Sequence, residues 1–169
     1  DRYLRGVHTN CVCSDHEGGA YQAVSHLIGL GHRHIGYVSF YRKPTTSLAD
    51  RRSGYERALA EQRLPAGESL IRFDDGTNDF DFENAVADAQ RFLAEHPHLT
   101  AVFGATSFSG LAVMEAARRL GRNVPEELSV IFFDDVEHAG LHRVPPSCVV
   151  QPQRELGREA AKLLLAVIA

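Results

Sequence analysis

The sequence lacks the features that mark nucleic-acid-binding domains and membrane proteins. Lys and Arg number 18 against 22 Asp and Glu, which gives a formal net charge of −4 at pH 7. That balance disfavours direct binding of this chain to DNA phosphates. No stretch approaches the roughly 18 apolar residues of a membrane-spanning helix, and residues 1–5 contain no signal-peptide apolar segment. We therefore expect a cytoplasmic protein that does not contact a membrane.

Cysteine is scarce as well. The chain has three cysteines, an odd number, and Cys11 and Cys13 lie two positions apart in an apolar run. In a strand both side chains would point the same way. No further ligands at supporting spacing complete a metal site there, so the prediction is reduced thiols, as in cytosolic proteins.

Two pairs of histidines are the other candidates for a metal site, His32 with His34 and His96 with His98. The first pair falls at a predicted helix-to-strand turn and the second at a helix end, where polar or cationic side chains suit the helix dipole. We predict that both pairs are structural. The sequence thus predicts no metal and no cofactor.

Catalytic motifs are also missing. The chain has no glycine-rich phosphate loop and no Ser/His/Asp order at a strand-to-helix nucleophile turn. Residues 74–77 are superficially similar to the aspartate motif of haloacid-dehalogenase-like phosphatases. That motif needs a carboxylate two positions before Asp75, where this chain has Phe73. We predict that the chain is not an enzyme.

Apolar periodicity predicts alternating strands and helices. Runs of strand length occur at residues 35–40, 70–73, 101–105, 128–133 and 148–150. Helical patterns lie between consecutive members of the first four runs. One more helical pattern, from Ala20 to Gly29, precedes the first run, and another follows the last run through position 167. The nearly continuous apolar character of residues 128–133 suits a strand buried on both faces. The predicted fold class is α/β, an open, mostly parallel sheet with helices on both faces.

Polar residues follow the predicted strands, where ligands bind in open α/β sheets. Such residues suit a hydroxyl-rich ligand. Side-chain hydroxyls and a guanidinium donate hydrogen bonds to it, a carboxylate accepts hydrogen bonds from its hydroxyls, and an aromatic ring packs against its C–H face. The predicted ligand-binding residues, in strand order, are Thr45, Ser47 and Arg51, then Phe80, then Thr106 and Ser107, then Asp134.

Each candidate also has a purely structural explanation, which the sequence leaves open. Ser107 could cap the third helix of the β/α alternation, Asp134 could cap or end the fourth strand, Phe80 could belong to the core, and Arg51 could pair at the surface with Asp50 or Glu56.

Several motifs occur together and in a characteristic order. They lie at residues 15–20, 26–36, 51–59, 124–131, 133–135 and 151–157. On these motifs the chain resembles the effector-binding domain of LacI/GalR-type bacterial transcription regulators. Some GntR-type regulators carry the same domain, which is similar to type I periplasmic sugar-binding proteins. The resemblance covers essentially the whole chain.

The resemblance implies a periplasmic-binding-protein-like fold in which two lobes, joined by three crossing strands, close on an effector. It divides the chain into a remnant of the first lobe with a crossing segment (1–33), the second lobe (34–148), and a return crossing with a first-lobe helix (149–169). Most of the first lobe would then lie outside these residues. The implied partners are a small-molecule effector, a carbohydrate or carbohydrate derivative, a second copy in a homodimer, and operator DNA through a domain not in this chain.

The resemblance also assigns roles. Arg51 matches the main ligand-binding arginine of the family, Asp134 its ligand-binding aspartate, and Phe80 lies near its stacking aromatic. Thr45 and Ser47 match the loop that contacts ligand.

The chain departs from the family at two places. Thr106 and Ser107 replace an Asn-Asp pair, and Phe132 replaces a glycine. Without that carboxylate the ligand remains open among a sugar held differently, a phosphorylated or acidic sugar, and another polar molecule. The alternative function is a periplasmic sugar-binding protein of a transporter, which the upstream sequence would distinguish from a regulator.

Overall fold

The computed structural model describes residues 3, 6, 9–40, 45–67, 70–73, 81–137, 139–141 and 143–168. Its centre is a five-stranded parallel sheet in the order β2-β1-β3-β4-β5. Ile35 of β1 pairs with Ala101 of β3, which pairs in turn with Ser129 of β4. The strands are β1 (Ile35–Ser39), β2 (Ile71–Phe73), β3 (Ala101–Gly104), β4 (Ser129–Phe133) and β5 (Ser147–Val149). The predicted α/β class is confirmed.

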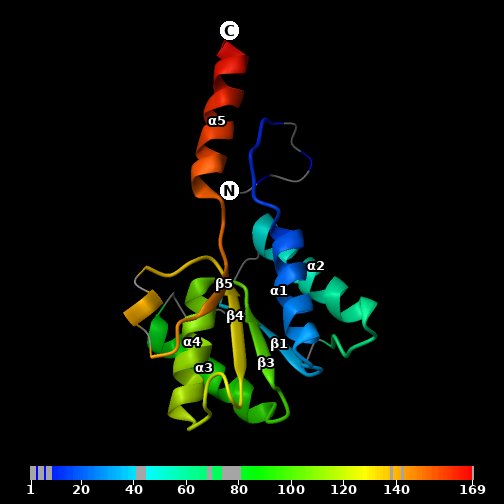
Figure 1. The fold of residues 1–169 in the computed structure, drawn as a ribbon, viewed down its shortest axis with the longest axis vertical. Coiled ribbons are helices and arrows are strands. Elements are labelled where there is room, and N and C mark those ends of the chain that lie inside the picture. Colours follow the sequence, from blue (N-terminus) through cyan, green and yellow to red (C-terminus); the bar gives the residue numbers. More distant parts are fainter. Residues whose placement is uncertain are drawn as a thin grey trace.

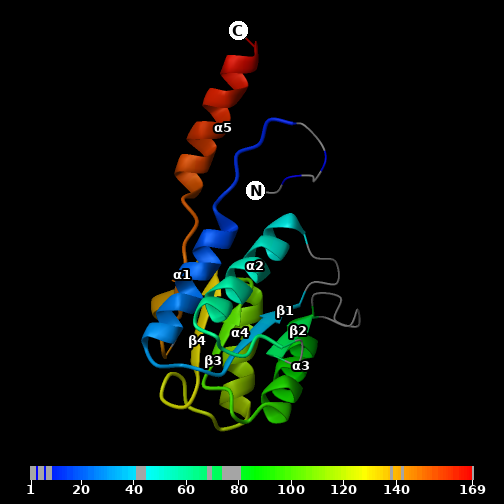
Figure 2. The same ribbon diagram turned by 90° about the vertical axis from the view of Figure 1, so that its right-hand side faces the viewer.

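Helices cover both faces of the sheet (Figures 1 and 2). One face carries α1 (His16–Gly29) and α2 (Thr46–Glu61), and the other carries α3 (Phe82–Glu95) and α4 (Ser107–Arg119). A short 3-10 turn, Ala139–Leu141, lies between β4 and β5. The last helix, α5 (Gln153–Ile168), extends away from this body.

The helices begin where their sequences supply capping oxygens. Asp15, Thr45, Asp81 and Thr106 each precede a helix and accept a hydrogen bond from a backbone N–H in its first turn. Their side chains satisfy donors that the helix itself leaves unpaired. These four residues of the sequence thereby set where α1, α2, α3 and α4 begin.

Alternating strand residues fill two separate cores. Tyr37 and Phe103 point toward α1 and α2, whereas Val38 and Val102 point toward α3 and α4. All four are fully buried. Because both faces are covered, the strands are apolar nearly throughout, as residues 128–133 predicted.

Two glycines allow close approaches between elements. A Cβ on Gly54 of α2 would lie 2.2 Å from the backbone oxygen of Glu17 in α1, so α1 and α2 pack at backbone distance only with glycine there. A Cβ on Gly110 of α4 would lie 2.0 Å from Cδ1 of Phe132. The buried Phe132 therefore occupies space that Gly110 leaves open.

The helix α5 differs from the other four in burying none of its residues. Its large apolar side chains Leu164, Leu165, Val167 and Ile168 are 60–71% exposed. A hollow between this helix and the segment before α1 is lined by Asn10, Val12, Ala160, Leu163, Leu164 and Val167. Among the described residues, no helix combines the length and apolar character needed to cross a bilayer.

Candidate functional site

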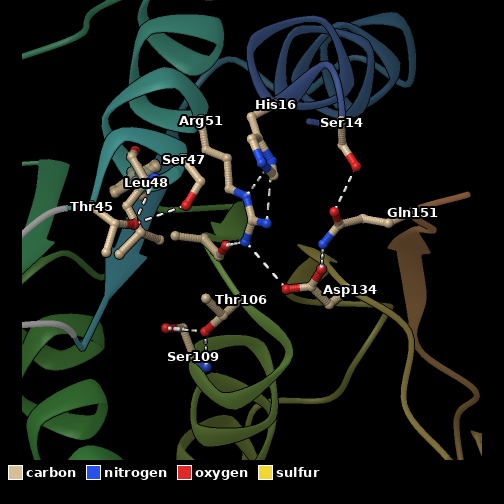
Figure 3. A network of polar contacts seen from close by, with 12 residues as sticks. Ser14, His16, Thr45, Ser47, Leu48, Arg51, Thr106, Ser109, Asp134 and Gln151 are labelled. Carbon is tan, nitrogen blue, oxygen red and sulfur yellow. Dashed lines mark hydrogen bonds and ion pairs between the residues drawn. The ribbon is translucent and has the colours of Figure 1, made fainter. Parts of the chain in front are cut away.

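Arg51 is the centre of a polar network at the carboxyl end of the sheet (Figure 3). It lies in α2, and only 5% of its surface is exposed. Its Nη1 donates to the carbonyl oxygen of Ala105, directly after β3, at 2.7 Å, and to Oδ2 of Asp134, directly after β4, at 3.2 Å. One guanidinium therefore joins the ends of two neighbouring strands to α2.

His16, the first residue of α1, contacts the edge of the guanidinium that carries Nε and Nη2. Nε and Nη2 of Arg51 lie 3.4 and 3.3 Å from Nδ1 of His16. Since arginine can only donate, Nδ1 must be the acceptor, and this requires a ring without a proton on that nitrogen. Burial, and then the positive charge of Arg51, lower the pKa of His16 below its usual 6.5. The network thus favours neutral His16.

The aromatic ring of Phe133 packs against the face of the Arg51 guanidinium. The Cζ atom of Arg51 lies 3.8 Å from the centroid of the Phe133 ring, a cation–π arrangement. The His16 ring lies 5.6 Å from the same ring, tilted by 50°. Together these contacts fix the plane of the guanidinium.

Asp134 is held in an uncommon backbone conformation. Its φ is +74°, in the left-handed region, and its N–H donates to the carbonyl oxygen of Val149 at 3.0 Å. Gln151 donates through Nε2 to its Oδ1, and Ser14 donates to Oε1 of Gln151 at 2.7 Å. Non-glycine residues in this region typically cost about 1–3 kcal/mol and cluster at functional sites. The carboxylate is therefore placed by Gln151 after β5, which is itself held by Ser14 before α1.

The predicted hydroxyl residues lie around Arg51, and several are engaged in caps. Thr45 accepts from the N–H of Leu48 at 3.4 Å and lies 2.8 Å from the hydroxyl of Ser47. Thr106 caps α4 through the N–H of Ser109 at 3.2 Å. Ser107, the first residue of α4, is half-buried.

The structure decides between some of the open explanations. Surface pairing of Arg51 is wrong, because Arg51 is buried and it is Arg52 that pairs with Glu56, at 2.6 Å. Ser107 as the cap of α4 is also wrong, because Thr106 is the cap. Phe80 lies outside the described residues.

Four members of the network were not predicted from the sequence: His16, Phe133, Gln151 and Ser14. Each stood next to or within a motif that carried the family resemblance, at residues 15–20, 133–135 and 151–157. A signal was available in their positions, since His16 opens a helix, Phe133 precedes the candidate Asp134, and Gln151 directly follows the last strand region.

The arrangement is suited to binding a polar molecule. It presents a rigid guanidinium, a carboxylate with 32% of its side chain exposed, and several hydroxyls at one end of the sheet. Within the described ranges, no group of three or more His, Cys, Asp or Glu residues is arranged to hold a metal ion.

Residues 24–169 match the sequence model of the periplasmic binding protein-like domain. The chain belongs to this family. The resemblance to LacI-type regulators is confirmed by relatives such as catabolite control protein A of Priestia megaterium, 33% identical over 153 residues that make up 90% of this chain and 45% of that protein. The chain spans less than half the length of curated relatives such as this one.

Solved structures agree with this family membership. The regulator CelR in complex with cellobiose is 34% identical, with a TM-score of 0.78 over 89% of this chain and 45% of that chain. A sugar-binding regulator of the LacI family from Escherichia coli, complexed with phosphate, is 27% identical with a TM-score of 0.84, over 97% and 57% of the two chains.

Proposed function

We propose that this chain is the ligand-sensing part of a bacterial transcription regulator and that it binds a sugar or sugar derivative. The observation that carries the proposal is the buried Arg51 guanidinium, paired with Asp134 at the carboxyl end of a parallel sheet. Ligands of open α/β sheets bind at this end. The cellobiose complex of CelR supports a carbohydrate as the ligand class.

In this proposal the site binds without catalysing a reaction. Thr45, Ser47, Thr106 and Ser107 supply hydroxyls around the charged pair, and Phe80 supplies a stacking ring. Asp134 accepts from ligand hydroxyls while Arg51 donates. The regulatory names of the relatives support binding as the function.

The domain division is part of the same proposal. Residues 34–148 form the second lobe, and residues 1–33 and 149–169 belong to crossing segments and to the first lobe. The exposed apolar side chains of α5 support this division, because a helix with an apolar stripe normally buries it against another element. Closure of two lobes on the ligand then shifts the affinity of a separate domain for operator DNA, by a coupling typically of about 1–3 kcal/mol. The regulator would act as a cytoplasmic homodimer, matching paired operator half-sites.

A thermal-shift screen against sugars, sugar phosphates and nucleosides tests the proposal on a longer chain that contains both lobes. A ligand at about 100 times its Kd stabilises the folded state by about 2.7 kcal/mol, which raises Tm by roughly 5–10 °C for a domain of about 150–250 residues and by less for the longer chain. Arg51→Lys and Asp134→Asn should abolish the shift, whereas Arg52→Ala on the same helix should retain it. A shift that survives both site variants would place the ligand elsewhere.

The periplasmic alternative has a direct test. The sequence upstream of these residues in the gene should encode a helix-turn-helix domain if the protein is a regulator. A signal peptide there would instead identify a transporter component.

A further inference from the structure

Two thiols face each other on the segment that leads into α1. The Sγ atoms of Cys11 and Cys13 lie 2.8 Å apart. A disulfide bond is about 2.05 Å long, so the two sulfur atoms are within an ångström of bonding distance. The two cysteines are not joined by a bond in this structure.

The local chain geometry suits a bond between them. Val12, which separates them, lines the hollow against α5. With one residue between them and their Sγ atoms 2.8 Å apart, Cys11 and Cys13 direct their side chains toward each other. A disulfide needs Cβ atoms about 3.5–4.5 Å apart, so the ring closes once the segment 11–13 bends by the small amount that brings the sulfur atoms to bonding distance.

The two thiols differ in accessibility. Cys11 is exposed and Cys13 is half-buried. Burial, together with the neighbouring Cys11, raises the pKa of the Cys13 thiol. Cys11 is therefore the thiol that a reagent in solution meets first, and Cys13 is placed to react with it afterwards.

We propose that Cys11 and Cys13 form a reversible disulfide in exchange with a low-molecular-weight disulfide. The Cys11 thiolate attacks one sulfur of the small disulfide, a mixed disulfide forms, and one small thiol leaves. Cys13 then attacks Cys11 Sγ, the mixed disulfide breaks, and the second small thiol leaves. Two electrons pass from the cysteine pair to the small disulfide, and the two thiol protons end on the two released thiols.

The pair lies one residue from the polar network. Ser14 follows Cys13 and donates to Gln151, which donates to Asp134, the partner of Arg51. Closing a ring over residues 11–13 changes the backbone that places the Ser14 hydroxyl. Oxidation therefore alters the position of the Asp134 carboxylate. This consequence for ligand binding rests on the proposed function, whereas the disulfide itself does not.

Peptide mapping of the whole chain tests the disulfide. The chain is equilibrated in mixtures of reduced and oxidised glutathione, alkylated and digested with trypsin without reduction. Peptide 6–33 contains Cys11 and Cys13 but no other cysteine, and peptide 144–154 contains Cys148. We expect peptide 6–33 to lose the mass of two hydrogen atoms and to escape alkylation, and reduction to restore it. Two alkylated thiols under oxidising conditions, or two glutathione adducts on this peptide, would overturn the proposal.

Single variants assign the roles. Cys13→Ser should stop at one glutathione on Cys11, because the resolving thiol is gone. Cys148→Ser should leave the oxidation of peptide 6–33 unchanged. If Cys13→Ser still lost two hydrogens from this peptide, the assignment of the pair would be wrong.

Hydrogen exchange tests the link to the network. In the first turn of α1, the N–H of Gly18 is protected by Asp15. We expect oxidation to speed amide exchange in this turn several-fold in the parent chain and not at all in Cys11→Ser. Equal exchange in the oxidised and reduced parent chain would show that the disulfide does not reach the ligand site, whatever the ligand proves to be.

Discussion

The helices of the body and the last helix share an apolar helical pattern but lie in opposite environments. Helices α1 to α4 each bury a face against the sheet, whereas α5 carries an apolar stripe and buries no residue. Periodicity in the sequence predicted a helix in both cases. Periodicity establishes that a helix has an apolar face, but the partner of that face is a property of the rest of the molecule.

The largest expected difference between the two regions comes from truncating apolar side chains. Phe103 in β3 is fully buried, so Phe103→Ala should lower the free energy of unfolding by about 3–5 kcal/mol. Leu165 in α5 is 67% exposed, and Leu165→Ala should change it by less than about 0.5 kcal/mol. Urea unfolding measures both. A comparable loss for Leu165→Ala would mean that α5 is packed in solution.

Replacing a glycine by alanine should lower stability in the body and raise it in α5. Gly54→Ala forces α1 and α2 apart, because the new Cβ would meet the Glu17 backbone oxygen, and should destabilise by about 1–3 kcal/mol. Gly157 in α5 has no atom within 4 Å of such a Cβ. Gly157→Ala should therefore stabilise α5 by about 0.5–1 kcal/mol. Circular dichroism during thermal unfolding distinguishes the two, and a gain for Gly54→Ala would refute the close approach.

Charge removal should also act differently in the two regions. Asp134→Asn removes the carboxylate that pairs with the buried Arg51, and we expect a loss of about 1–2 kcal/mol, because the partial exposure of Asp134 and the contacts that Arg51 keeps with Ala105 and His16 moderate the penalty. The matched change in α5 is Glu155→Gln, which removes an exposed pair with Arg158. That pair should contribute less than about 0.5 kcal/mol. Equal losses in urea unfolding would contradict the burial of the network.

The smallest expected effect is a dependence on pH. The pKa of His16 is lowered by burial and by Arg51, so the folded state binds fewer protons than the unfolded state below the ordinary pKa of 6.5. The free energy of unfolding is therefore highest above pH 6.5, where His16 is neutral in both states. It decreases as the pH falls from 6.5 toward the pKa of His16 in the folded state. His32, whose pKa burial also lowers, acts in the same direction. Helix α5 contains no histidine.

Urea unfolding of the body between pH 8 and pH 5 measures this dependence. His16→Gln combined with His32→Gln should flatten it, because glutamine keeps a hydrogen-bond acceptor and does not titrate. In α5 the hydrogen bond from Lys162 lowers the pKa of Glu159 below the ordinary value of 4.5. The Glu159–Lys162 pair therefore weakens only at a pH below this value, outside the range of the experiment. An unchanged slope in the double variant would show that other groups titrate in this range.

The sequence predicted the fold closely and the site partly. The five strands lie within the predicted apolar runs to within a residue or two, because a sheet covered on both faces needs continuous apolar strands. Arg51, Asp134 and Thr106 were expected at the carboxyl ends of strands, and the structure brings them together. His16, Phe133 and Gln151 were not expected, since their roles depend on the packing of α1, β4 and the segment after β5 around one guanidinium, which no spacing along the chain encodes.

The strand order has a consequence for how the molecule folds. Every neighbouring pair of strands is parallel, and β1 pairs with β3 across all of α2, β2 and α3. No pair can therefore form as a local hairpin, and the first pairing must close a long loop before any contact compensates for the lost chain entropy. Folding should be slow relative to helical proteins of this length. The rate should be sensitive to the β1–β3 contact, where Ile35 meets Ala101.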